Sequence, residues 1–130
     1  MKQIEVVAAI IRYKDKILCA KRGIAKYPYI SYKYEFPGGK VEKNETIEQA
    51  IVREIKEELH LEILSPTYFT TVKHTYPDFR ITMHSFLCNV DHMDITLTEH
   101  IDIQWLPIPE LSELEWAEAD IPIVNKLQTK

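Results

Sequence analysis

Three glutamates in one short stretch of predicted helix are the residues of this sequence best suited to bind a metal ion. Glu54, Glu57 and Glu58 are spaced i, i+3 and i+4, so their Cβ atoms lie on one helix face about 5 to 6 Å apart. Their charges repel one another, and Lys56 points to the opposite side of the helix. Such carboxylates are the hard oxygen ligands that Mg²⁺ prefers, and Mg²⁺ completes its shell with water and substrate phosphate oxygens. The spacing therefore indicates a potential phosphate site, although a run of this kind, taken alone, is more often a solvated helix face.

Two adjacent glycines strengthen the functional interpretation. Gly38 and Gly39 belong to a Phe-Pro-Gly-Gly cluster upstream of the helix, and Glu45 lies between the two features. The cluster predicts a break in regular structure, a glycine turn whose carbonyls could join the carboxylates around a cation. A divalent metal held there would neutralise phosphates, polarise a phosphorus and lower the pKa of an attacking water.

The helix that must position the glutamates is delimited by its capping signals. Thr46 and Gln49 fit a capping box, so the helix is expected to begin there and to run to about Leu59. Its apolar residues share one arc of about 100°, the width typical of a core-facing helix: Ile51, Val52, Ile55 and Leu59.

The remaining elements are predicted to form one mixed sheet. Apolar stretches at 4–13, 17–21, 68–73, 80–90 and 103–106 predict strands, the first two as a hairpin. A short helix is expected in the acidic stretch after Pro109, and 121–130 suits a closing amphipathic helix. We therefore expect an α/β (α+β) fold, a mixed β-sheet between α-helices, in a single domain over residues 1–130.

Composition excludes several classes of protein. The chain has 130 residues, of which 45% are hydrophobic and 28% charged, as is usual for one globular domain. A formal net charge of -4 disfavours a nucleic acid polymer as partner. No stretch approaches the roughly 20 apolar residues that span a bilayer, so no membrane is expected. Cys19 and Cys88 each lie inside an apolar run, which favours reduced core residues and a cytoplasmic location.

The glycine and glutamate positions resemble the Nudix box. The pattern runs from Gly39 through five residues to Glu45, and through seven more to Arg-Glu-Ile-Lys-Glu-Glu-Leu-His-Leu at 53–61, 23 residues in all. One defined position departs, because His60 stands where the family has a glycine. That glycine suits a left-handed helix cap, a conformation that costs a non-glycine residue about 1 kcal/mol. The segments 4–11, 34–40, Trp105 and 119–122 extend the resemblance to the MutT-like branch, nearest to bacterial CTP pyrophosphohydrolases with the 8-oxo-dGTP-sanitising enzymes as the near alternative.

The resemblance implies the Nudix fold and a reaction. It implies Mg²⁺-dependent cleavage of a nucleoside triphosphate to the monophosphate and pyrophosphate, with Mn²⁺ as a substitute metal. The implied metal ligands are the Gly38 carbonyl, Glu54, Glu57, Glu58 and Glu99, and the implied catalytic carboxylates are Glu54, Glu57 and Glu99. We favour Glu54 as the residue nearest the role of general base, with Glu99 as its rival; the sequence does not rank them.

Supporting and substrate-binding roles follow the same resemblance. Arg53 is expected to orient glutamates through charge-assisted hydrogen bonds, and Glu45 to support the metal site. Arg22 and Lys40 are candidates to meet the phosphates or the base edge. Substrate choice is assigned to Asp120 and to the tyrosine-rich segment that ends at Tyr34. A carboxylate can accept from the exocyclic amino group of cytosine and a tyrosine can stack on the ring, so Asp120 favours CTP or a modified (d)CTP.

Other functions remain open at this point. The same loop could accept a purine, so an 8-oxo-dGTP-sanitising diphosphatase is the main alternative. A non-catalytic nucleotide-binding regulatory module should have lost the helix carboxylates, and all three are present. A zinc or thiol enzyme is disfavoured because no cysteine and histidine spacing matches a zinc site. The chain could be a monomer or a homodimer.

Overall fold

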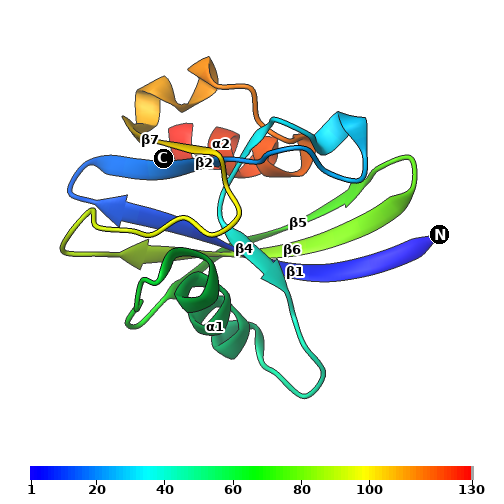
Figure 1. Cartoon of the computed structure of the whole chain (residues 1–130), viewed down its shortest axis with the longest axis horizontal. Helices are drawn as coiled ribbons and strands as arrows, with labels where there is room; N and C mark the ends of the chain where they lie inside the picture. Colours follow the sequence, from blue (N-terminus) through cyan, green and yellow to red (C-terminus); the bar gives the residue numbers. More distant parts are fainter. Residues whose placement is uncertain (130) are drawn as a thin grey trace.

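The computed structural model describes residues 1–129. A mixed sheet with the order β3-β2-β1-β6-β5 runs through the described chain, with β4 paired to β1 and β7 paired to β2 (Figure 1). The strands are β1 (Lys2–Tyr13), β2 (Lys16–Lys21), β3 (Tyr34–Glu35), β4 (Gly38–Lys40), β5 (Thr67–Thr75), β6 (Phe79–Asn89) and β7 (Asp102–Pro107). The helices are α1 (Ile47–Leu59), α2 (Ile121–Gln128) and the 3₁₀ helices η1 (Pro28–Ile30), η2 (Ile108–Glu113) and η3 (Glu118–Asp120). The mixed sheet with helices is confirmed.

Strand β1 is the centre of the fold because both of its faces are buried. Residues 7–11 are all at most 1% exposed. Alternate side chains enter two separate cores, with Ala8 and Ile10 on one face and Val7, Ala9 and Ile11 on the other. Such a strand needs helices on both sides, because each face carries apolar groups that must leave water.

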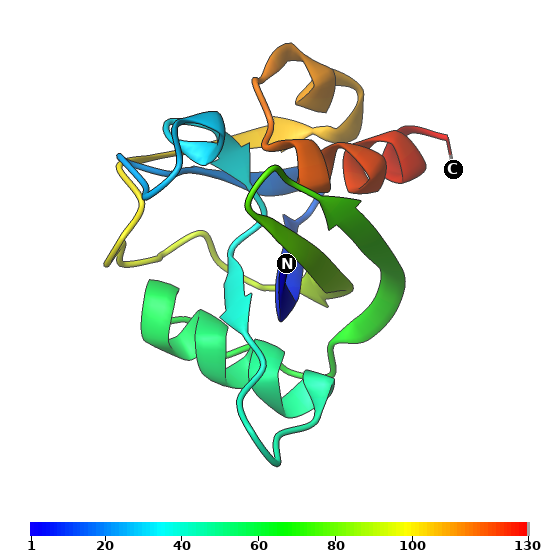
Figure 2. The same cartoon turned by 90° about the vertical axis from the view of Figure 1, so that its right-hand side faces the viewer.

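The two faces of the sheet are covered by different helices. Figure 2 shows α1 on one side of the sheet and α2 with η2 on the other. Helix α1 packs Ile51, Ile55 and Leu59 into one core, and α2 packs Ile123 and Leu127 into the other. The expected helix at 121–130 is therefore present as far as Gln128, and Lys130 lies outside the described residues. Within residues 1–129, no helix is long and apolar enough to cross a membrane.

Helix α1 begins and ends as its sequence indicates. Thr46 accepts a hydrogen bond from the Gln49 backbone N–H at 3.0 Å, and the Gln49 side chain accepts from the Thr46 N–H at 3.0 Å. At the other end, His60 adopts the left-handed conformation with φ 54° and ψ 36°, and its N–H donates to the Lys56 carbonyl. The helix exit thus keeps the conformation suited to glycine, with histidine in that place.

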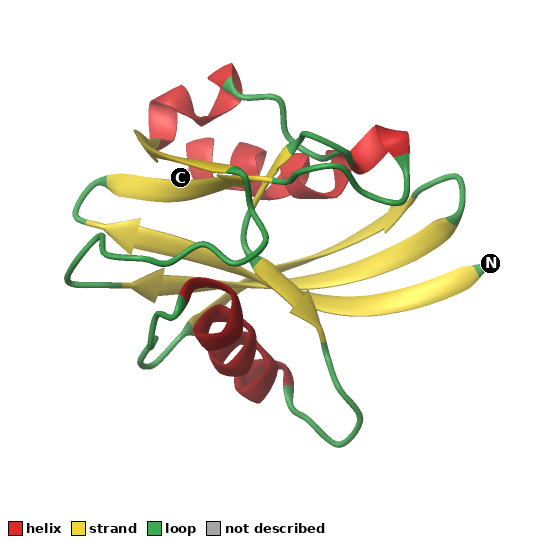
Figure 3. Ribbon diagram, in the orientation of Figure 1, coloured by secondary structure: helices red, strands yellow, loops and turns green. Residues whose placement is uncertain are grey.

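The glycine cluster does not form the predicted turn. Residues 38–40 form the short strand β4, antiparallel to β1, with Gly38 opposite Ala8 and Gly39 opposite Val7. Strand β2 pairs with β1 only near the Arg12 and Tyr13 end, which leaves the middle of that edge of β1 to β4. The chain therefore crosses from β3 to β4 over the middle of the sheet, and this crossing brings the glycines to α1 (Figure 3).

Candidate active site

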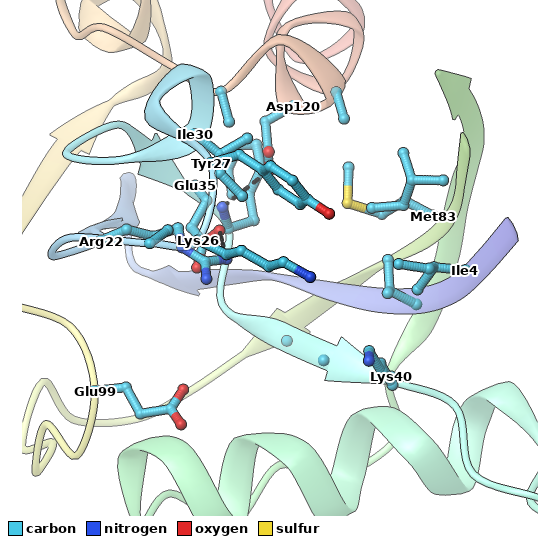
Figure 4. Close-up of a pocket in the computed structure, with 18 of the residues that line it drawn as sticks. Ile4, Arg22, Lys26, Tyr27, Ile30, Glu35, Lys40, Met83, Glu99 and Asp120 are labelled. Atoms are coloured by element: carbon cyan, nitrogen blue, oxygen red, sulfur yellow. Dashed lines mark hydrogen bonds and ion pairs between the residues drawn. The ribbon is translucent and has the colours of Figure 1, made fainter. Parts of the chain in front are cut away.

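A cavity of about 700 Å³ opens between β4 and α1 on one side and the segments 22–30 and 117–120 on the other. Eight of the residues that the sequence singles out line it: Arg22, Gly38, Gly39, Lys40, Glu54, Glu58, Glu99 and Asp120. They come from segments far apart in the chain, and Figure 4 shows Glu99 and Asp120 at different ends of the cavity. The cavity therefore has an acidic end near α1 and a second end near α2.

The glycines allow α1 to approach β4 closely. A Cβ at Gly39 would overlap the Glu54 carboxylate, and a Cβ at Gly38 would overlap the Val7 carbonyl of β1. The Gly38 N–H donates to Glu58 Oε2 at 3.1 Å. Because neither glycine has positive φ, their role is close approach and not an unusual backbone conformation. The Gly-Gly sequence thus places two α1 carboxylates directly against a backbone strand.

The carboxyl groups at the acidic end of the cavity have raised pKa values, because nearby positive charge does not offset their burial and mutual repulsion. Burial, the charge of Glu35 and a hydrogen bond with Glu99 raise the pKa of Glu58 to about 9. Burial also raises the pKa of Glu54, and the charges of Glu57 and Glu99 add to this effect against the lowering effect of Arg53. Crowded hard oxygen donors of this kind would be relieved by a divalent cation. Within the described residues no group of three or more His, Cys, Asp or Glu side chains is arranged as a metal site, so the ligand set stays a prediction.

Arg53 organises a second group of glutamates outside the cavity. Its Nε and Nη2 donate to the two carboxylate oxygens of Glu45, at 2.6 and 2.9 Å. Its Nη1 donates to Glu57 at 3.2 Å, and Nη2 also donates to the Lys40 carbonyl at 3.0 Å. The guanidinium lowers the pKa of Glu45 to about 2. Arg53 therefore ties the loop before α1 and the end of β4 to the helix.

Glu57 differs in position from the other two helix glutamates. It does not line the cavity, and its side chain is 60% exposed in the ion pair with Arg53. Helical spacing puts Glu57 on the same face as Glu54 and Glu58, but the arginine draws its carboxylate to the outer side. The structure thus brings together Glu54, Glu58 and Glu99 and leaves Glu57 beside them.

Asp120 supplies the polar group at the second end of the cavity. The residue is 4% exposed, and its Oδ1 accepts from the Phe36 N–H at 3.1 Å. Burial and the charge of Glu35 raise the pKa of Asp120 well above its ordinary value. Although Asp120 precedes α2, its side chain makes no capping hydrogen bond to that helix. A neutral Asp120 carboxyl can both donate and accept a hydrogen bond.

The tyrosine-rich segment contributes one ring to the cavity wall. Tyr27 lines the cavity, stacks on Tyr29 with ring centroids 5.3 Å apart, and packs against Phe79. Tyr34 is buried and does not line the cavity. Its hydroxyl accepts from Gln104 at 3.0 Å and lies 3.5 Å from Asp102. The structure therefore does not bring Tyr34 into the cavity, and Tyr27 is the tyrosine of this segment that lines it.

Among the polar residues that line the cavity, sequence reasoning missed Glu35, Lys26, His100 and Lys2. Glu35 accepts from Arg22 at 3.3 Å and from His100 at 2.9 Å. Lys26 extends across the cavity, with its ammonium 5.4 Å from the centre of the Tyr27 ring (Figure 4). Glu35 lies inside the Tyr-Glu-Phe-Pro-Gly-Gly segment that the resemblance includes, so its place beside the glycines was the available signal. No local pattern marks His100 or Lys26.

Comparisons with known proteins address the family and the fold of the chain. A family model described as NUDIX domain matches residues 1–127. The CTP pyrophosphohydrolase of Escherichia coli (strain K12) is 36% identical over 125 residues, covering 96% of this chain and 91% of that protein. The 8-oxo-dGTP diphosphatase of the same strain is 30% identical over 128 residues, covering 98% of both. A solved structure of the Nudix hydrolase MutT from methicillin-resistant Staphylococcus aureus 252 has a TM-score of 0.76 at 44% identity, covering 99% of this chain and 98% of that one.

Proposed function

The chain belongs to the Nudix family, as a hydrolase acting on acid anhydrides, and on this premise we propose that it converts a nucleoside triphosphate to the monophosphate and pyrophosphate with Mg²⁺. One observation supports this above the others. A single cavity contains crowded carboxyl groups at one end, and at the other a buried carboxyl group whose pKa is raised by burial, near an aromatic ring. A nucleotide has the matching polarity, with a polyanion at one end and a flat base at the other.

The acidic end would hold the metal. We propose Glu54, Glu57, Glu58 and Glu99 with the Gly38 carbonyl as ligands, and Mn²⁺ as a substitute ion. The ion would neutralise the phosphates, polarise the phosphorus and lower the pKa of the attacking water. Because Glu54 lies against Gly39 with a raised pKa, it is the carboxyl that we expect to accept the proton, with Glu99 as the rival.

Cations around the cavity would meet the phosphates. Lys40 lies on β4 beside the glycines, and Lys26 extends over the middle of the cavity (Figure 4). Arg22 already pairs with Glu35, so its guanidinium is oriented within the cavity wall. We expect Lys40 and Lys26 to act on the phosphate chain and Arg22 to act nearer the base.

Asp120 directs the choice of base. A neutral carboxyl can donate to N3 of cytosine and accept from its N4 amino group, which makes a two-bond match. We therefore propose CTP or a modified (d)CTP as substrate, in agreement with the name of the relative at 36% identity. The raised pKa of Asp120 also supports a second candidate, because a protonated carboxyl can donate to O6 and accept from N1–H of guanine. That pairing would suit 8-oxo-dGTP, the substrate named for the relative at 30% identity.

A nucleotide panel with product identification tests the proposal. CTP, dCTP, 5-methyl-dCTP, UTP, dGTP and 8-oxo-dGTP would be supplied with Mg²⁺, and the products separated by ion-exchange chromatography. The proposal expects a monophosphate and pyrophosphate, with the highest kcat/KM on a cytosine nucleotide. Much faster turnover of 8-oxo-dGTP would reject the cytosine assignment alone, whereas no turnover of any triphosphate would reject the proposed reaction.

Two substitutions at Asp120 test the base contact. Asp120→Asn keeps one donor and one acceptor without a titrating proton, so kcat/KM should stay within about tenfold of wild type. Asp120→Leu has a similar size and neither group, and should lower kcat/KM about 10- to 100-fold, the value of a two-bond base contact. Equal activity of the Leu variant and wild type on every base would show that Asp120 does not read the substrate.

A further inference from the structure

The segment that carries Glu99 has little regular structure of its own. Residues 90–101 connect β6 to β7 and pass the C-terminal end of α1 (Figure 3). Ile95 and Leu97 pack on the α1 side of the sheet, and the Thr96 N–H donates to the Leu59 carbonyl at 3.0 Å. The Ile101 N–H donates to the Lys21 carbonyl at 2.9 Å, so Glu99 lies between two backbone contacts five residues apart. Its position between them depends on the side chains of its neighbours.

Both neighbours of Glu99 are tied to other elements by side-chain hydrogen bonds. Thr98 Oγ1 donates to the Glu58 carbonyl at 3.0 Å, which ties one side to α1. His100 Nε2 lies 2.9 Å from Glu35 Oε2, which ties the other side to β3. Since a carboxylate only accepts, the His100 ring donates in this contact. Glu99 is thus held between two anchors on two different layers of the fold.

The His100 side chain is buried, and its partner Glu35 is itself held in place by other contacts. The His100 side chain is 3% exposed, and within the described residues its Nδ1 has no hydrogen-bond partner. Glu35 belongs to β3, where it pairs with Ala20 of β2, and its other oxygen accepts from Arg22 at 3.3 Å. Burying a polar imidazole ring stabilises a protein less than burying an apolar side chain does. The hydrogen bond to Glu35 is therefore the interaction that accounts for a histidine at this position.

We propose that His100 is a positioning residue for Glu99. By donating to Glu35, it fixes the backbone next to Glu99 and keeps the Glu99 carboxyl facing Glu58 at the acidic end of the cavity. The inference rests on the proposed function, in which Glu99 is a metal ligand, and assigns to His100 no contact with the reacting atoms. Outer contacts that orient a ligand are worth about 10- to 100-fold in metal affinity or activity.

Three variants test the role. His100→Leu removes the donor, His100→Asn keeps a polar side chain too short to reach Glu35, and His100→Gln retains an amide donor of suitable length. We expect kcat to fall about 10- to 100-fold in the Leu and Asn variants, with KM for the nucleotide within about threefold of wild type. The Gln variant should recover most of kcat. Failure of Gln to exceed Asn would overturn the hydrogen-bond role.

A double-mutant cycle identifies the residue through which His100 acts. If His100 works through Glu99, then His100→Asn should have almost no further effect on kcat in a Glu99→Gln background. Effects that multiply would overturn the assignment. His84→Asn is the matched control, because His84 Nε2 contacts Glu5 at 2.8 Å outside the cavity, and it should leave kcat unchanged.

Two measurements without nucleotide separate this inference from the proposed reaction. Amide hydrogen exchange at residues 98–101 should accelerate in His100→Asn and return toward wild type in His100→Gln. Mn²⁺ binding, followed by electron paramagnetic resonance, should weaken about 10- to 100-fold in the Asn variant. If wild type hydrolyses no triphosphate, the reaction is wrong while these two results still decide the positioning. Unchanged exchange and Mn²⁺ binding would overturn the positioning even in an active enzyme.

Discussion

Two groups of glutamates on either side of α1 have opposite electrostatic environments. The outer cluster, Glu42, Glu45 and Glu57, surrounds Arg53, whereas the inner cluster, Glu54, Glu58 and Glu99, lies at the acidic end of the cavity. The pKa of Glu45 falls to about 2 beside the guanidinium, and the pKa of Glu58 rises to about 9. The pKa of a glutamate is therefore lowered in one cluster and raised in the other, although the two clusters adjoin the same helix.

The difference shows which cluster the protein completes by itself. Arg53 neutralises the outer cluster with a two-bond contact to Glu45 and a contact to Glu57. The inner cluster receives one backbone N–H from Gly38, and Arg53 only at 3.7 Å from Glu54. Burial without compensation is costly, so a structure keeps such a cluster where a cation from outside relieves it. The comparison therefore supports the inner cluster as the proposed metal site.

The largest expected effect is loss of turnover when the inner cluster is changed. Glu54→Gln removes the carboxyl against Gly39 and should lower kcat about 10²- to 10⁴-fold, the range for a general base. The free energy of unfolding should stay the same or rise, because burial already disfavours the charge at this position. Steady-state kinetics and urea unfolding measure the two quantities. Glu62→Gln, an exposed change beyond the helix, is the control, and equal kinetics in the two variants would contradict the assignment.

A smaller but more discriminating effect is expected at Glu57, which belongs to the outer cluster by position and to the metal site by prediction. We expect Glu57→Gln to lower kcat about 10- to 100-fold, because the loss of a metal contact acts in addition to the loss of the Arg53 ion pair. The Mg²⁺ concentration needed for half-maximal rate should rise in parallel. A change in kcat below about threefold, with normal Mg²⁺ dependence, would place Glu57 entirely in the outer cluster.

The two clusters should also give opposite pH dependences of stability. Folded Glu58 titrates near 9 and an ordinary glutamate near 4.5, so between these values the folded chain binds more protons than the unfolded chain. Stability without metal should therefore fall as pH rises from about 5 to 9, by at most about 1.4 kcal/mol per pH unit for one group. Glu54 and Asp120 act in the same direction, so Glu58→Gln should reduce the slope without removing it.

Glu45 provides the contrast in the same urea experiment. Its lowered pKa means that its stabilising effect is present above about 4.5 and is lost as pH falls toward 2. Glu45→Gln should leave the slope between pH 5.5 and 8.5 unchanged. A flat wild-type curve over that range would show that the inner carboxyls are not protonated in the folded chain.

The smallest expected effect is at the end of the helix that carries both clusters. His60→Gly relieves a left-handed residue that has a side chain, and should raise the free energy of unfolding by up to about 1 kcal/mol. Since His60 is exposed and outside the cavity, kcat should change less than twofold. A large change in kcat would mean that the helix exit controls the clusters as well as stability.

Local signals predicted the helix well and the glycine segment poorly. The Thr46 and Gln49 capping box involves residues three apart, so the sequence contains the whole interaction. Strand β4 depends instead on pairing with β1, 30 to 34 residues earlier, and Gly38 and Gly39 have no side chains to show periodicity. Two adjacent glycines indicate a flexible backbone, and this predicted a turn. They do not indicate the strand with which that backbone pairs.

The cavity shows the same division. Glu54, Glu58 and Glu99 could be named from spacing and resemblance, but the contact between Glu35 and His100 joins residues 65 apart in the chain. Tyr34 and Tyr27 look alike in the sequence, and only the packing puts Tyr34 under the wall and Tyr27 in it.

The sequence by itself determined the helix, its capping, the carboxylate spacing and the family, because each depends on neighbouring residues or on a pattern of fixed length. Only the tertiary structure decided in which direction the pKa of each carboxyl group shifts. The pKa values of Glu45, Glu58 and Asp120 depend on burial and on charges brought together from distant segments. Desolvation and Coulomb interactions act through space, and so the chemistry of each acid is set by the fold.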